Sequence, residues 1–309
     1  MKQKVLYLAI FLLFGAGAFA QQDALVSQYM FNGLYLNPAY AGSHAYWSSS
    51  LTYRNQWVRF DGAPTTFIAA VDGPIPDKNM GLGFIFMNDC IGVTKQNAFM
   101  ANYSYQLKIN ETDKLAFGIN AGVSQFNADL TQLTVWDQDE IFQKDLTGRL
   151  IPKAGLGAYY YSKKFYAGLS VPTLLAYQDE DGYTFSADLS KSSFLRRHYL
   201  LTGGYVIDLK REFKLKPSLL LKYTENAPLQ ADFNLSVVYK DMIWLGSSFR
   251  TGDACVFLIE YQPNNHFRVG YAYDLSFSKI RNYSDGSHEL MIGIDFGKDL
   301  VKVKTPRYF

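Results

Sequence analysis

The residue types that most often carry out chemistry are sparse in this chain, and their spacing matches no catalytic or metal-binding pattern. The histidines are His44, His198, His266 and His288. They lie far apart, and none belongs to an HxH, HExxH or HxxE motif. The run Ser287-His288-Glu289 contains the three residue types of a hydrolase triad, but consecutive strand residues alternate faces, so these side chains cannot converge. We therefore expect no enzyme activity, no metal site and no cofactor.

Charged and polar residues do recur at positions that alternate with apolar ones. They are Arg54, Gln56, Asp232, Arg250, Asp274 and Asp295. In an extended strand this alternation directs the polar side chains to one face. Inside a narrow barrel such charges usually pair with one another, because an unpaired buried charge is costly. We interpret the six residues as a polar network that fills a lumen; a transport path is the alternative that the sequence leaves open.

The elements that must position these residues are short amphipathic strands. In the stretch "FRVGYAYDLSF", large apolar side chains occupy one parity, while Arg268 and Asp274 lie on the other parity among small residues. The same period recurs at about 46–60, 65–73, 82–87, 99–107, 115–123, 152–161, 164–171, 199–209, 215–223, 233–239, 243–249, 255–261, 267–277 and 290–296. The sequence therefore predicts about fourteen strands.

These runs predict an all-β fold, namely a transmembrane outer-membrane β-barrel of about 14 antiparallel strands after a cleaved signal peptide. A tilted strand needs about 10 residues to cross a bilayer, and single-chain bacterial barrels have an even number of strands. In hydrocarbon every backbone polar group must be paired internally, which only a closed barrel achieves for strands. The alternative is a secreted two-sheet sandwich. The 23 Tyr and 23 Phe residues exceed what one soluble core of this size normally holds and favour the barrel.

Connection lengths support the barrel independently. Brief, turn-forming or charged segments such as "INETDK", "SKK" and "PNNH" alternate with longer ones, and the two longest, 127–151 and 172–197, fall on the opposite side. Outer-membrane barrels have short periplasmic turns and longer external loops. We therefore expect residues 46–297 to form the barrel, with the two long loops outside the cell.

The N-terminal residues 1–20 have the features of a cleaved signal peptide. Two lysines precede an apolar run that ends in "AFA", a small-x-small cleavage pattern. An N-terminal membrane anchor is the alternative. Removal of the two lysines lowers the formal charge from +2 to 0, so the mature chain has no basic surplus for nucleic acid. We expect the mature protein in the bacterial outer membrane, in contact with its lipid.

Only two cysteines, Cys90 and Cys255, are present in this exported chain. Two cysteines in a chain of this length argue against a disulfide scaffold. Cys255 shares the parity of apolar neighbours, which favours a free thiol that faces a core or lipid. A bridge between the two remains an alternative.

The segment before the first strand, residues 21–45, differs from the strands. Its stretch "FNGLYLNPAYAG" (31–42) is neither periodic nor charged and is too specific for a linker. Asn37 and Pro38 force an extended backbone, and Gly42 favours a turn; Tyr40 lies between them. We expect this segment to plug or skirt the periplasmic mouth of the barrel.

The chain ends in a segment, 298–309, that we expect to form a periplasmic tail. Its last residues are Tyr308 and Phe309. A terminal aromatic residue is what the barrel-assembly machinery typically reads in outer-membrane proteins, although Pro306 separates it here from the last strand. The alternative is a polar tail that happens to end in Phe.

Several stretches resemble one known family. They are "QYMFNGLYLNPAYAG" (28–42), "YRNQWVRFDGAPTTF" (53–67), "FYAGLSVP" (165–172), "PLQADFNLSVVY" (228–239), "WLGSSFR" (244–250), "GYAYDLSFSKI" (270–280), "GSHELMIGIDFG" (286–297) and the closing "PRYF". These stretches look like the PorP/SprF family of type IX secretion system membrane proteins of the Bacteroidetes. The resemblance covers nearly the whole mature chain, and "NPAYAG" and "GSHE" are its more specific motifs.

The resemblance implies a non-enzymatic outer-membrane component of the type IX secretion and gliding machinery. Members of the family are associated with secreted adhesins and with periplasmic lipoproteins or OmpA-like, peptidoglycan-binding proteins. The resemblance implies that this chain supports secretion and surface attachment of partner proteins such as adhesins and links to periplasmic, peptidoglycan-bound partners. A core member of the machinery and a cargo-specific paralogue both fit. From a different class, an outer-membrane diffusion channel or small-molecule transporter is the alternative function, and it requires an open polar lumen.

Overall fold

The computed structural model describes residues 26–132, 145–174, 176–178, 182–184, 197–209, 212–224 and 227–297. The expected signal peptide, the start of the 21–45 segment and the tail with Tyr308 and Phe309 lie outside these described residues. Within the described ranges, no helix is long and apolar enough to cross a membrane.

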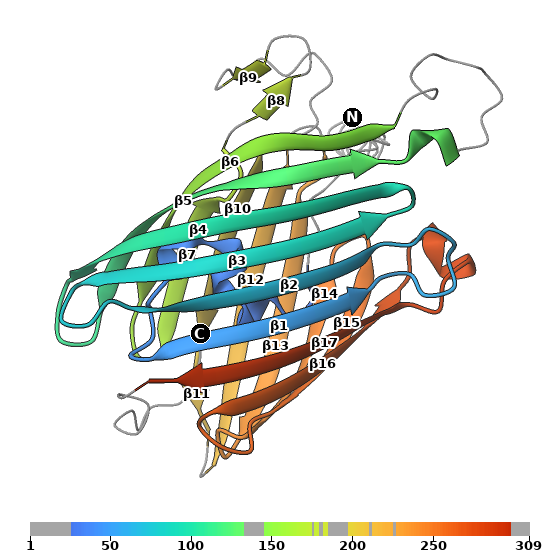
Figure 1. The fold of residues 1–309 in the computed structure, drawn as a ribbon. Coiled ribbons are helices and arrows are strands. Elements are labelled where there is room, and N and C mark those ends of the chain that lie inside the picture. Colours follow the sequence, from blue (N-terminus) through green and yellow to red (C-terminus); the bar gives the residue numbers. More distant parts are fainter. Residues whose placement is uncertain are drawn as a thin grey trace, which may run out of the picture.

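The described residues form a closed antiparallel β-barrel of fourteen strands (Figure 1). Its strands are β1 (Trp47–Asn55), β2 (Thr65–Pro74), β3 (Met80–Ile91), β4 (Thr94–Lys108), β5 (Lys114–Ala128), β6 (Leu146–Tyr161), β7 (Phe165–Val171), β10 (His198–Tyr205), β12 (Phe213–Thr224), β13 (Gln230–Tyr239), β14 (Ile243–Arg250), β15 (Ala254–Tyr261), β16 (Phe267–Ser276) and β17 (Ser287–Phe296). The two-residue β11 (Ile207–Asp208) continues β10 after Val206. The predicted fold class is therefore confirmed.

Two sets of strand pairs close the barrel. The first and last strands pair along their length, from Trp47 with Phe296 to Asn55 with His288. Strand β10 pairs with both β7 and β12, which joins the two halves. Because every strand has two neighbours, the backbone polar groups of the spanning region are paired within the sheet, as a hydrocarbon environment requires.

The strand alternation seen in the sequence separates a lipid face from a lumen face. On β16, Phe267, Tyr271 and Leu275 are exposed, whereas Arg268 and Asp274 are buried in the interior. The outward positions of the other strands likewise hold exposed Leu, Ile, Phe and Tyr side chains. The outside of the barrel therefore presents the apolar surface that contacts lipid.

The connections differ between the two ends of the barrel. At one end, here called the short-turn end, all connections have three to five residues: 75–79, 109–113, 162–164, 209–212, 240–242 and 262–266. The opposite, long-loop end holds the longest connections, 129–145 and 172–197, together with tight turns such as 92–93. Short elements lie at this end, namely η3 (Leu130–Gln132) in the first long connection, the paired β8 (Ala176–Gln178) and β9 (Gly182–Thr184) in the second, and η5 (Lys279–Asn282) between β16 and β17.

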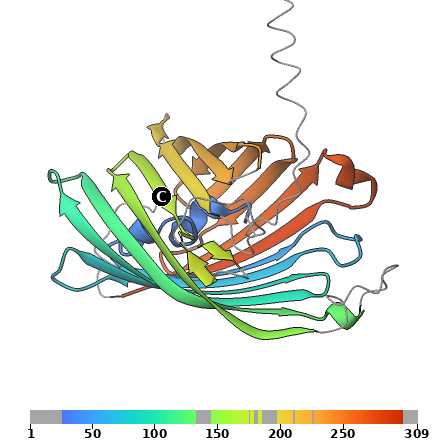
Figure 2. The ribbon, with the colours of Figure 1, turned by 90° about the horizontal axis from the view of Figure 1, so that it is seen from above.

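The residues before β1 fold into the interior of the barrel. Three short helical turns follow one another, η1 (Tyr29–Phe31), α2 (Gly33–Leu36) and η2 (Pro38–Tyr40). Seen from above, these blue turns lie within the ring of strands (Figure 2). We call residues Val26–Tyr46 the plug. Nearly all its residues from Val26 to Gly42 are buried, so the lumen is occupied over much of its length.

Candidate functional site: a plug fixed inside the barrel

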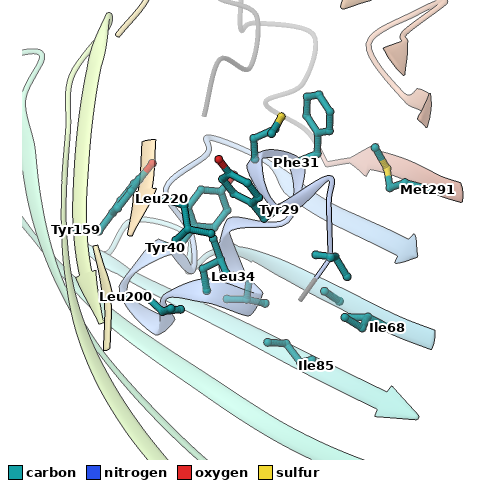
Figure 3. Close-up of a cluster of buried hydrophobic side chains, with 14 of the residues drawn as sticks. Tyr29, Phe31, Leu34, Tyr40, Ile68, Ile85, Tyr159, Leu200, Leu220 and Met291 are labelled. Carbon is teal, nitrogen blue, oxygen red and sulfur yellow. The ribbon is translucent and has the colours of Figure 1, made fainter. Parts of the chain in front are cut away.

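Apolar side chains of the plug make the core of the molecule. Tyr29, Phe31, Leu34 and Tyr40 point into the lumen and are at most 6% exposed (Figure 3). They pack with inward-facing wall residues, among them Ile68, Ile85, Tyr159, Leu200, Leu220 and Met291. Burial of such side chains stabilises by about 1.5–3 kcal/mol each. The lumen thus has a packed apolar core at the level of the plug.

Glycines in the wall let the plug backbone lie directly on the strands. A Cβ atom on Gly118 of β5 would meet the backbone of Pro38 and Ala39, and one on Gly81 of β3 would meet the backbone of Ala41. A Cβ atom on Gly157 of β6 would meet the side chain of Asn37. Since no larger residue fits without a shift, the docking of residues 37–42, here called the docking segment, depends on these glycines.

Asn37 joins the docking segment to the wall through its side chain. Its Oδ1 accepts a hydrogen bond from the N–H of Ala39 at 2.9 Å, which caps η2 with Pro38 at the first position. Its Nδ2 donates to the carbonyl of Ala158 at 2.9 Å. Tyr40 packs edge-on against Tyr159, with ring centroids 5.5 Å apart. The side-chain amide of Asn37 therefore caps a turn of the plug and fixes the plug to β6.

The end of the docking segment reaches the short-turn mouth. Gly42 adopts a φ of 66°, a left-handed conformation that favours glycine. Its N–H donates to Asp72 at 3.0 Å, and its carbonyl accepts from Gln106 at 2.6 Å. The hydroxyl of Ser104 donates to the carbonyl of Ala41 at 2.6 Å. These buried backbone groups are satisfied by wall side chains, as burial requires.

The other end of the plug is held by charged residues near the long-loop end. We call this group the anchor cluster; it contains Ser27, Arg54, Asp232, Arg250, Asp274 and Glu289, all nearly fully buried. The carboxylate of Glu289 accepts from the backbone N–H groups of Ser27 and Gln28 at 2.6 and 2.8 Å. Both hydrogen bonds are charge-assisted, because the acceptor is an ionised carboxylate, and such bonds are stronger than those between neutral groups.

Arg54 connects the carboxylates of two strands with the plug. Its guanidinium donates to Asp274 at 2.8 Å, to Glu289 at 3.1 Å and to the hydroxyl of Ser27 at 2.8 Å. The Ser27 hydroxyl in turn donates to Asp274 at 2.7 Å. Removal of one partner from such a buried network leaves an uncompensated charge.

Arg250 extends the anchor cluster to β13. It contacts Asp232 at 3.0 Å, Asp274 at 3.4 Å and the less buried Asp253 at 3.4 Å. One of its amino groups also donates to the Ser27 hydroxyl at 3.3 Å. Two arginines thus share Asp274 and Ser27, so the cluster is one network.

The six residues singled out from the sequence do not all meet. Asp295 forms a separate pair with Arg268, at 3.3 Å, and accepts from Ser48 at 2.6 Å near the short-turn end. Gln56 lies in the connection after β1, half-buried, with its backbone N–H bonded to Pro64. Strand β1 ends at Asn55, so the alternation that suggested an inward Gln56 no longer applies there.

Sequence reasoning missed two members of the anchor cluster. Glu289 entered it only as part of an implausible triad, although its parity opposite Leu290 and Ile292 indicates an inward side chain. Ser27 carries no sequence signal, because its role depends on the plug's entry into the barrel. Among the described residues, no group of three or more His, Cys, Asp and Glu side chains is arranged to hold a metal ion.

The comparison with protein families identifies the chain's relatives. The family model described as type IX secretion system membrane protein PorP/SprF matches residues 18–294 of this sequence. The chain belongs to this family. No curated protein sequence matches this PorP/SprF protein. Its fold and its family together make it a membrane β-barrel of the outer-membrane type.

Three solved structures of similar fold share little sequence with this PorP/SprF protein. The KdgM porin is 11% identical with a TM-score of 0.40, covering 81% of this chain and 99% of the porin. The Ralstonia pickettii toluene transporter TbuX is 10% identical with a TM-score of 0.47, covering 85% and 92%. The TodX deltaS2S3 mutant monoaromatic hydrocarbon channel is 9% identical with a TM-score of 0.45, covering 85% and 93%. At this distance the likenesses indicate no function.

Proposed function

We propose that this PorP/SprF protein is a non-enzymatic component of the type IX machinery that supports secretion and surface attachment of partner proteins such as adhesins. In this proposal it also links to periplasmic, peptidoglycan-bound partners, as lipoproteins or OmpA-like proteins would be. The observation that carries the proposal is the plug, which fills the lumen and is fixed at both ends. A filled barrel acts through the surfaces at its two ends.

The plug argues against the alternative of a diffusion channel. Water-filled pores have polar, open lumens. Here Tyr29, Leu34 and Tyr40 occupy the interior, and the charges of the anchor cluster are paired with one another instead of lining a path. Opening such a lumen requires the plug to leave both the anchor cluster and the docking segment's wall contacts.

The two ends of the barrel suit two kinds of partner. By the usual orientation of outer-membrane barrels, the short-turn end faces the periplasm and the long-loop end faces the outside. The connections 129–145 and 172–197 provide external surface for a secreted protein. At the other mouth, the short turns provide a compact surface for a periplasmic protein. The barrel then couples the two compartments by contact alone.

A deletion strain complemented with designed variants tests this function. We expect deletion to release a type IX cargo protein from the cell surface without changing the uptake of small solutes. A variant in which a short Gly-Ser linker joins Leu174 to Arg197 should restore the barrel but not cargo retention, because surface loops tolerate replacement while they carry binding.

A variant that lacks residues 26–46 serves as the positive control for permeability, since its lumen is emptied. We expect this variant to admit small solutes that the wild-type protein excludes. If deletion of the whole protein leaves every surface protein in place and alters only small-solute uptake, the diffusion-channel function is correct and the proposal is wrong.

A further inference from the structure

The barrel closes where its first strand meets its last. Strands β1 and β17 lie side by side (Figure 1) and pair in antiparallel register over the whole of β1. We call this junction the seam. Because no turn joins the two strands, their pairing closes a loop that contains the rest of the barrel, and loop closure costs more entropy as the loop lengthens. The seam therefore depends more than a hairpin does on contacts beyond the ladder of backbone hydrogen bonds.

Such contacts are present at the long-loop end of the seam. The backbone N–H of Val58 donates to the carbonyl of Gly286 at 2.8 Å, and the N–H of Asp285 donates to the carbonyl of Val58 at 3.0 Å. The N–H of Trp57 donates to the hydroxyl of Ser287 at 3.1 Å. The connection after β1 is thus bound directly to the residues that precede and begin β17.

The short-turn end of the seam is held by side chains. The hydroxyl of Ser48 on β1 donates to Asp295 on β17 at 2.6 Å and accepts from Arg268 at 3.2 Å. The hydroxyl of Ser49 donates to the carbonyl of Ile294 at 3.1 Å. These bonds cross the seam without any residue of the plug.

Between the two ends, the plug itself crosses the seam. Arg54 of β1 lies opposite Glu289 of β17 in the register, and their side chains are 3.1 Å apart. The backbone N–H groups of Ser27 and Gln28 donate to the same carboxylate, at 2.6 and 2.8 Å. Arg54 donates to the Ser27 hydroxyl at 2.8 Å, and this hydroxyl donates to Asp274 of β16. Ser27 therefore contacts the first strand and the last two strands at once.

Burial increases the effect of these contacts. Ser27, Gln28 and Glu289 are each 1% exposed, and Arg54 is 2% exposed. Water does not compete for their donors and acceptors, so each hydrogen bond is stronger than at the surface. Without the plug, the Glu289 carboxylate loses two donors, and a buried charge that loses donors is destabilised.

We propose that the first residues of the plug are a latch that holds the seam closed. Docking of Ser27 and Gln28 stabilises the pairing of β1 with β17, and this pairing brings together Arg54 and Glu289, to which they dock. Such coupling is reciprocal, so each event strengthens the other by the same factor. The plug thereby fills the lumen and stabilises the wall. This inference is independent of the proposed function, because it concerns the closure of the barrel and not its partners.

Hydrogen exchange of the mature protein in lipid nanodiscs, followed by mass spectrometry, tests the latch. Exchange of the backbone N–H groups of a strand reports how often that strand opens. Ser27→Ala removes the hydroxyl that joins Arg54 to Asp274 and changes no residue of the wall. We expect exchange in β1 and β17 to become about tenfold faster, because a hydrogen bond to a charged group contributes about that factor. Exchange in β4, which contributes no residue to the anchor cluster, should keep its wild-type rate.

Ser43→Ala is the matched control. It makes the same change in the plug at the short-turn end, where the Ser43 hydroxyl has no hydrogen-bond partner among the described residues. We expect wild-type exchange in β1 and β17. A chain shortened by residues 21–28 lacks the latch altogether and should exchange at the seam about a hundredfold faster than wild type, since both backbone donors to Glu289 are lost as well.

A disulfide across the seam separates the latch from other roles of the plug. Leu51 and Ile292 lie directly opposite each other on the outward parity of β1 and β17, a placement that suits a disulfide. We expect Leu51→Cys with Ile292→Cys, in a chain with Cys90→Ser and Cys255→Ser, to restore slow exchange of the seam in the shortened protein once the bond is oxidised. Reduction of the bond should return the fast exchange.

Heat-modifiable migration on gels establishes that each variant is folded before exchange is measured. The proposal is overturned if the folded Ser27→Ala protein exchanges β1 and β17 at the wild-type rate, if Ser43→Ala has the same effect, or if exchange accelerates equally in β4. Fast exchange at the seam that persists with the disulfide formed would equally show that the plug does not act by holding the seam. Ser27→Ala keeps the test decisive where the shortened chain does not assemble.

Discussion

The two ends of the plug are held by contrasting physics. At the long-loop end, Ser27 is bound by the buried charges of Arg54, Asp274 and Glu289. At the short-turn end, the docking segment lies on wall glycines such as Gly118 and is held by neutral or singly charge-assisted bonds. The first contact depends on charge balance, and the second depends on shape.

This difference suggests how a lumen can be kept closed. A charged network tolerates small shifts in position but not the loss of one member. A backbone packed on glycine tolerates changes of charge nearby but not an added methyl group. Loss of a charge should weaken the plug's attachment at the long-loop end, and an added methyl group should weaken it at the short-turn end. A single substitution should therefore release one end and leave the other bound.

The largest effect is expected for Arg54→Met in the anchor cluster. The change leaves Asp274 and Glu289 without a main partner, which should cost about 3–5 kcal/mol of unfolding free energy. Urea unfolding in detergent measures this loss. Planar-bilayer conductance should also rise, because the plug loses its attachment near the long-loop end.

The matched control is Arg59→Met, since Arg59 pairs with Asp285 at the surface, with side chains 74% and 56% exposed. That pair should contribute only about 0–1 kcal/mol. Equal losses in Arg54→Met and Arg59→Met would show that the anchor cluster acts as an ordinary surface pair.

The next largest effect is expected for Gly118→Ala at the docking segment. The new methyl group would meet the backbone of Pro38 and Ala39, so the plug must shift, at a cost of about 1–3 kcal/mol. Faster proteolysis of the plug in the folded barrel reports the shift. As control, Gly203→Ala on β10 places its methyl no nearer than 3.6 Å from the Tyr166 carbonyl and should be neutral. If proteolysis of the plug is equally fast in both variants, the plug backbone is not in close contact with Gly118.

An effect of similar size is expected for Asn37→Asp, which keeps the size of the side chain. The carboxylate still accepts from Ala39, but its second oxygen faces the carbonyl of Ala158, and the lost bond should cost about 1–3 kcal/mol. Asn264→Asp is the control, because Asn264 Oδ1 accepts from two backbone N–H groups in an exposed turn. If the unfolding curves of the two variants coincide, Asn37 does not help to hold the plug.

The smallest effect is expected outside the plug, at the exposed turn 109–113. Hydrogen bonds from Thr112, Asn110 and Tyr160 hold the pKa of Asp113 below its ordinary value of 3.8. A lowered pKa stabilises the folded state above pH 3.8, and this contribution is lost as the pH falls through the folded-state pKa. The stability difference between wild type and Asp113→Asn should therefore be small at pH 7 and vanish in acid. A difference that grows in acid would contradict this assignment.

The fold was largely predictable because one physical constraint acts on every strand. A membrane barrel needs alternating lipid-facing and lumen-facing residues, and β16 shows the period over its whole length. The same parity directs Arg54, Asp232, Arg250 and Asp274 inward. The parity does not apply to Gln56, because it indicates a face only while the strand continues, and β1 ends one residue earlier.

The arrangement of the plug was only partly accessible. The aperiodic stretch around Asn37 and Pro38 indicated a segment that is not a strand, and its place at the periplasmic mouth was the expectation. In the structure the plug extends from the anchor cluster to the short-turn mouth, and only Gly42 and its neighbours lie at that mouth. Its depth is set by wall glycines on three strands, which are far from the plug in sequence.

The amino-acid sequence by itself determined the barrel, its number of strands, its apolar exterior and the sign of the charges inside, because local alternation and chain length control these features. Only the tertiary structure decided which charges meet. Ser27 joins Glu289 from the opposite end of the chain, and Gly118 receives the backbone of Ala39. Such contacts depend on the closure of the sheet around the plug, and closure brings together residues that no local pattern relates.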